Sequence, residues 1–135
     1  MEKVFLTKDD ILQVQDLPVK EVFVKEWNGY VFMRTLTAKE KEDYEWYIYT
    51  QGKKTEKTGG VIEDARVRLV ASCLVDAQGE RMFSVEEFKV LAGKSSSAIE
   101  SLFKVAQQMN GMEVEEADRV VQDLSKGQSE SSTSS

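Results

Sequence analysis

The stretch that most constrains the fold runs from Asp64 to Asp76 and reads DARVRLVASCLVD. It is the most apolar run in the chain, and it contains neither glycine nor proline. Frequent valine leaves a strand as the alternative, but the run is long for a strand and its apolar residues do not alternate. Apolar residues instead cover most sides of a helical projection. The stretch therefore predicts a central helix, beginning near Val61, that the rest of the chain buries.

A β-hairpin is predicted upstream of this helix. Residues 21–27 follow a period of two around Val22 and Val24, and a second β-rich run covers residues 30–35. Asn28-Gly29 lies between the runs, and this dipeptide is typical of tight hairpin turns. A lone hairpin is marginally stable in water, so one of its faces is expected to lie on the helices or to pair with another chain.

Helix-start signals predict further helices on both sides of the central one. A capping box is a serine or threonine followed three residues later by a glutamate, and it satisfies free backbone N–H groups at a helix start. Thr7 is expected to cap a short first helix with a small apolar face. The capping boxes and glycine stops predict helices over residues 37–49, 84–93, 97–110 and 113–124.

The polar segments complete the predicted organisation. Residues 51–60 read QGKKTEKTGG and predict a mobile loop, residues 76–79 a turn, and residues 81–83 a short extended piece. Past Lys126 the chain reads GQSESSTSS, which has nothing to bury and is predicted to be disordered. We expect one mostly helical α+β domain over residues 1–126, with the N-terminal antiparallel hairpin packed on the central buried helix, and a polar tail over residues 127–135.

Composition argues against several functions. The net charge is −6 and the pI is about 4.8, which disfavours binding to nucleic acid or to an anionic membrane. No apolar run approaches the roughly 20 residues of a membrane span. Histidine is absent, and the single cysteine, Cys73, falls within the predicted buried helix. We therefore expect no enzyme activity, no cofactor and no metal site.

Two groups of residues are candidates for contact with a partner or with a second copy. Arg66 and Arg68 interrupt the apolar run and point about 160° apart on a helix. Each needs an acidic partner, for which Asp64 and Asp76 are candidates, or a route to solvent. Aromatic and arginine side chains commonly anchor interfaces, although a place in the core is the ordinary alternative for each aromatic. The candidate contact residues are Trp27, Arg34, Tyr44, Trp46, Tyr47, Tyr49, Arg66 and Arg68.

The order of these motifs resembles that of the tail assembly chaperones of long-tailed bacteriophages and related prophages. The matching pieces are DLP at 16–18, VFVKEWNGYVFMRTLTAKEKEDYE at 22–45, ARVRLVASCLVDAQGERMF at 65–83 and LAGKSSSAIESLFKVAQQMNGM at 91–112. The resemblance spans about Leu17 to Leu124. The chain departs from the family pattern by inserting Asn28 between Trp27 and Gly29, which affects the local loop.

The resemblance implies a protein of the host cytoplasm without enzyme activity. Such proteins bind the tape measure protein, a very long and largely helical chain, and help to recruit tail tube protein. They are absent from the finished virion. A second copy of the chain is a further candidate partner. The alternative is a small structural, connector or regulatory phage protein that is retained in the particle.

Overall fold

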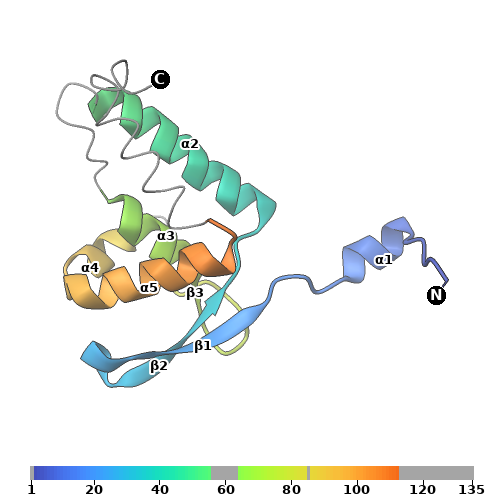
Figure 1. Ribbon diagram of the computed structural model, residues 1–135, viewed down its shortest axis with the longest axis horizontal. Helices are drawn as coiled ribbons and strands as arrows, with labels where there is room; N and C mark the ends of the chain where they lie inside the picture. Colours follow the sequence, from blue (N-terminus) through green and yellow to red (C-terminus); the bar gives the residue numbers. More distant parts are fainter. Residues whose placement is uncertain (1, 56–63, 85, 113–135) are drawn as a thin grey trace, which may run out of the picture.

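The computed structural model describes residues 2–55, 64–84 and 86–112, and within them the chain is α+β, as predicted (Figure 1). The predicted helix over 113–124 and the polar tail over 127–135 lie outside the described residues. The elements are α1 (Lys8–Gln13), β1 (Val19–Val24), η1 (Lys25–Trp27), β2 (Gly29–Arg34), α2 (Ala38–Thr55), α3 (Ala65–Cys73), β3 (Leu74–Val75), α4 (Phe88–Ala92) and α5 (Ser96–Met109).

The predicted hairpin is present, but its turn differs from the prediction. β1 and β2 pair antiparallel from Val19 opposite Arg34 to Val24 opposite Gly29, so residues 25–28 form the connection. Most of that connection is the 3₁₀ turn η1, and Asn28 then adopts the left-handed conformation with φ of 50°. Asparagine tolerates this region better than most residues. A longer connection forms because η1 packs against α5, an interaction that a local dipeptide cannot indicate.

The central helix is shorter than predicted, because its last apolar residues form a strand. α3 ends at Cys73, and β3 pairs antiparallel with β2, placing Leu74 opposite Met33 and Val75 opposite Phe32. Val75 also forms a bridge with Arg81, the predicted extended piece, across the predicted turn at 76–79. The apolar run is continuous through this junction, so hydrophobicity alone does not mark where the helix gives way to the strand.

The core lies between α3, α5 and the inner face of the sheet. Leu69 and Val70 of α3 and Leu102 of α5 have no exposed surface, and Met33 brings β2 into the same cluster. The hairpin packs chiefly on α5, while α3 fills the centre of the core. The complete set of buried apolar residues is Val24, Met33, Leu36, Leu69, Val70, Ala71, Cys73, Leu74, Val75, Phe88, Leu91, Ala98, Ile99, Leu102 and Ala106.

One of the predicted capping boxes is complete and opens its helix. Thr37 Oγ1 accepts the Glu40 N–H at 3.1 Å, and the Glu40 carboxylate accepts the Thr37 N–H at 2.9 Å, which completes the box ahead of α2. These bonds satisfy N–H groups that a helix start leaves without intrahelical partners. The helix start predicted at Ser84 is wrong: the Glu87 carboxylate accepts the Ser84 N–H at 3.0 Å, but α4 begins only at Phe88, and its N-cap residue Glu87 makes no side-chain capping bond.

The box predicted at Ser97 is wrong. α5 begins at Ser96, and Ser95 caps it by accepting the Ala98 N–H at 3.3 Å. Ser97 lies in the first turn, where its hydroxyl donates to a carboxylate oxygen of Glu26 at 2.7 Å and ties the helix to η1. Three consecutive serines offer three starting points, and packing against η1 selects among them.

α2 is longer than predicted. A helix ending near Tyr49 and a loop over 51–60 are expected from the sequence, but α2 continues to Thr55. Gly52 is the only residue in this extension with a strong penalty, about 1 kcal/mol relative to alanine. Two lysines follow it in the last turn, where the helix dipole favours positive charge. Residues 56–60 of the predicted loop lie outside the described residues.

Candidate interaction surface

Two aromatic side chains stand exposed on the outer face of α2. Trp46 is 65% exposed and Tyr49 is 55% exposed, and their rings stack with centroids 5.7 Å apart. Lys53 places its Nζ 4.7 Å from the centre of the Tyr49 ring. We call Trp46, Tyr49 and Lys53 the α2 ridge. Their spacing of three and four residues places them in one row along the helix.

The surroundings of the α2 ridge differ in charge from one end to the other. An open hollow beside the two aromatic rings is lined by Lys39, Glu42, Asp43, Glu45, Trp46 and Tyr49. The surroundings of the ridge are therefore largely acidic toward the N-terminus of α2, whereas Lys53 and Lys54 make them basic toward its C-terminus. Large adjacent aromatics of this kind are frequent anchors of protein interfaces. The arrangement suits an amphipathic segment that carries an apolar stripe between opposite charges.

The other two predicted aromatics of α2 face the body of the protein. Tyr44 is partly buried against the core, and its burial raises the pKa of the phenol to about 12. Tyr47 lies under the guanidinium of Arg68, with Arg68 Cζ 3.8 Å from the ring centre. These contacts fix α2 on α3, so Tyr44 and Tyr47 serve packing and the ridge residues face outward.

The two arginines of α3 find partners other than the predicted Asp64 and Asp76. Arg68 lies between the rings of Tyr47 and Phe88, and its Cζ is 4.2 Å from the centre of the Phe88 ring. Its Nε is buried without a hydrogen-bond partner in the described structure. A cation over an aromatic face is stabilised by the ring quadrupole, and guanidinium groups are favoured there.

Arg66 instead lies toward α5 at the protein surface. Its Nε is 3.8 Å from a carboxylate oxygen of Glu100, and its guanidinium is 5.8 Å from the centre of the Phe103 ring. Both charged side chains are more than half exposed, so this pair contributes little to stability. Asp76 is engaged elsewhere: its Oδ1 accepts the N–H groups of Gln78 and Glu80 within the turn.

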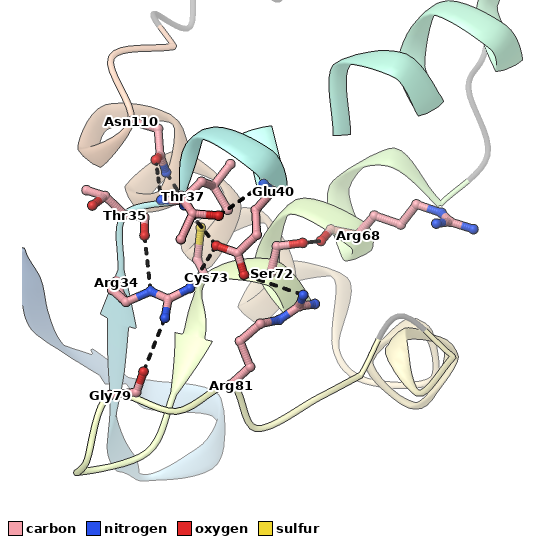
Figure 2. A network of polar contacts seen from close by, with 11 residues as sticks. Arg34, Thr35, Thr37, Glu40, Arg68, Ser72, Cys73, Gly79, Arg81 and Asn110 are labelled. Carbon is pink, nitrogen blue, oxygen red and sulfur yellow. Dashed lines mark hydrogen bonds and ion pairs between the residues drawn. The ribbon is translucent and has the colours of Figure 1, made fainter. Parts of the chain in front are cut away.

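Arg34 belongs to a polar network that joins three parts of the fold (Figure 2). Its Nη2 donates to Glu40 at 2.7 Å, and the two side chains are only 14% and 15% exposed. Arg34 also donates to the carbonyls of Gly79 at 3.3 Å and Thr35 at 3.2 Å. Arg81 reaches the second oxygen of Glu40 at 3.5 Å. The network ties β2, the start of α2 and the turn after β3 together, so Arg34 is a structural residue.

Asn110 is a structural residue that the sequence suggested only as a helix stop. Its Oδ1 accepts the Leu36 N–H at 2.8 Å, and its Nδ2 donates to the Ala106 carbonyl at 2.8 Å (Figure 2). The same Nδ2 lies 3.6 Å from Cys73 Sγ. The side chain therefore links the end of α5 to the segment before α2. Trp27, the remaining candidate, packs partly buried against the core from η1.

Cys73 is held as a neutral thiol. It has no exposed surface, and its burial raises the pKa of the thiol to about 11 from an ordinary 9.0. A reactive thiol needs an accessible setting and a lowered pKa.

A cavity of about 80 Å³ lined in part by Tyr44, Arg68 and Phe88 is well below the roughly 300–1,000 Å³ of ligand pockets. Among the described residues, no group of three or more ligating side chains could hold a metal ion.

The raised pKa of the Cys73 thiol predicts a loss of stability at alkaline pH. Between pH 9 and pH 11 the unfolded chain releases the thiol proton while the folded chain retains it, so stability falls as pH rises. The loss attributable to Cys73 is about 2–3 kcal/mol. Urea unfolding across this pH range should show a shallower decline for Cys73→Ala than for the wild type. Equal declines in the two proteins would contradict this assignment.

Comparison with known proteins identifies the fold. No protein-family model matches the chain. No curated protein matches it either. Among solved structures, that of the bacteriophage HK97 tail assembly chaperone is similar, with a TM-score of 0.51 and 21% identity, covering 69% of this chain and 85% of that chain.

At this identity the similarity concerns the fold, and it confirms the fold that the sequence resemblance implied. Within the part of the chain that the structure describes, no helix has both the length and the apolar character needed to cross a membrane. The similarity to the HK97 structure shows that the chain has a tail assembly chaperone-like fold.

Proposed function

We propose that this protein is a phage tail assembly chaperone that binds the tape measure protein in the host cytoplasm, helps tail tube protein to assemble, and is absent from the mature virion. The observation that carries the proposal is the similarity in fold to the HK97 tail assembly chaperone, which extends over 85% of that chain. The role is one of binding and requires no enzyme activity, cofactor or metal.

The α2 ridge is the proposed contact for the tape measure protein. A long helical client presents apolar stripes at three- and four-residue spacing, which match the row of Trp46 and Tyr49. The acidic and basic ends of the ridge would orient such a helix. The packed candidates Arg34, Tyr44, Tyr47 and Arg68 support the ridge from beneath, by fixing α2 on the sheet and on α3.

Co-expression with the tape measure protein of the same phage tests the proposal. The tape measure protein should remain soluble and co-purify with this chain, whereas without this chain it should aggregate. Salt should weaken the complex only modestly, because stacked aromatics and apolar stripes carry the contact. Failure to co-purify, together with detection of the protein in mature particles, would favour the retained structural or connector role.

A further inference from the structure

Arg68 carries a positive charge for which the described residues supply no acidic partner. Its guanidinium lies 3.8 Å from the centre of the Tyr47 ring and 4.2 Å from the centre of the Phe88 ring. Among the ion pairs of the described residues none includes Arg68, and its buried Nε meets no hydrogen-bond acceptor there. Arginine stays charged at neutral pH, so the two rings hold a cation in place without neutralising it.

The two rings leave only the edge of this guanidinium for a ligand. They cover its flat faces, and Nε is buried, so the donors that remain are the N–H bonds of the two Nη groups. The side chain as a whole is partly exposed, and Figure 2 shows it extending away from Glu40. A planar fork of N–H donors suits a carboxylate, and a fork that is already fixed loses little freedom on binding.

The two carboxylates that line the same small cavity as Arg68 are engaged by other cations. Glu40 is shared by the two arginines of the polar network in Figure 2, at 2.7 Å and 3.5 Å. Asp43 lies 3.0 Å from Lys39 Nζ. These four cations and two carboxylates together carry a net positive charge, which favours an acidic group from outside at the free edge of Arg68.

This basic site adjoins the α2 ridge. Asp43 lines both the cavity beside Arg68 and the hollow beside the ridge, so the two are contiguous. Lys54 follows Tyr47 by seven residues, or about two turns, and therefore lies on the same side of α2 as the Arg68 guanidinium. Because the hollow itself is largely acidic, the favourable place for an acidic side chain of a bound segment is this basic side.

We propose that the guanidinium edge of Arg68 binds a carboxylate of the tape measure protein, from an aspartate or glutamate of the segment that lies on the α2 ridge. The inference rests on the proposed function and adds a requirement on the client sequence, an acidic residue beside the apolar stripe. A single ion pair of this kind serves specificity and orientation more than affinity, which agrees with a complex that salt weakens only modestly.

The affinity of the tape measure protein for Arg68→Gln and Arg66→Gln, measured at low and high salt, tests this assignment. Arg68→Gln should raise the dissociation constant at low salt at least about tenfold, and its affinity should depend less on salt than that of wild type. Arg66→Gln is the matched control on the same helix, because Arg66 lies at Glu100, and it should bind as wild type does. Unchanged binding by Arg68→Gln, or a weaker complex with the salt dependence of wild type, would overturn the proposal.

Cross-linking through an Arg68→Lys variant identifies the carboxylate directly. A carbodiimide joins an amine to a carboxylate that it contacts, with loss of water. Mass spectrometry should find position 68 linked to an aspartate or glutamate of the tape measure protein, whereas Arg66→Lys should give no link to the client. A link from position 68 to this chain's own carboxylates, or none in a complex that forms, would overturn the proposal and leave the proposed function standing. Failure of the wild type to bind the tape measure protein would overturn both.

Discussion

Leu69→Asp is expected to abolish folding. Leu69 lies in the middle of α3 with no exposed surface, in the cluster that joins this helix to α5 and the sheet. Truncating a buried leucine to alanine alone costs about 2–5 kcal/mol. Aspartate adds the cost of a buried, unpaired charge, and the whole stability of a domain is only about 5–15 kcal/mol. Circular dichroism should show loss of helical signal, and the protein should be largely insoluble.

Two matched changes on α3 make this result interpretable. Arg66→Gln alters a more than half-exposed side chain on the same helix and should leave the fold and its stability nearly unchanged. Leu69→Ala should still fold but unfold at a lower urea concentration. A soluble Leu69→Asp protein with full helical signal would show that α3 does not form the centre of the core.

Glu40→Ala is expected to lower the free energy of unfolding by about 3 kcal/mol. Its carboxylate accepts hydrogen bonds from the Arg34 guanidinium and the Thr37 N–H, and it pairs with Arg81. Removing it leaves two largely buried guanidinium groups without their shared acceptor, and it also removes half of the capping box. Chemical denaturation should show a lower midpoint with little change in slope.

Asp43→Ala provides the control for Glu40→Ala, because Asp43 forms an ion pair on the same helix that is open to solvent. Its carboxylate lies 3.0 Å from Lys39 Nζ, and both side chains are more than 60% exposed. Such a pair is worth at most about 0.5 kcal/mol. If the two alanine variants lost equal stability, the polar network around Arg34 would not hold the sheet to α2 as described.

Much of the fold could be predicted from sequence signals that span only a few residues. The alternation around Val22 and Val24, the box at Thr37 and the apolar stripe of α5 each depend on neighbours within a few residues, and each is present. β3 was missed because its two residues continue an apolar run, and only the free edge of β2 makes them a strand. The connection in the hairpin was mistaken for a similar reason, since packing on α5 determines it.

The sequence does not indicate which of the candidate aromatic and arginine side chains are exposed and which are packed in the fold. Tyr44 and Tyr47 are three residues apart, as are Trp46 and Tyr49, so helix geometry divides them into two faces. Which face meets the core depends on α3, and the guanidinium of Arg68 over Tyr47 settles it. Arg34 pairs with Glu40 across a strand–helix junction, which the spacing rules for a single helix do not cover.

The most direct test of the account is the affinity of the tape measure protein for three purified forms of this chain: wild type, Trp46→Ala and Tyr30→Ala. Trp46 and Tyr30 are both exposed aromatic residues, but only Trp46 belongs to the α2 ridge. Trp46→Ala is expected to raise the dissociation constant at least about tenfold, whereas Tyr30→Ala should leave it unchanged. Unchanged binding by Trp46→Ala, or an equal loss in Tyr30→Ala, would contradict the placement of the client on α2.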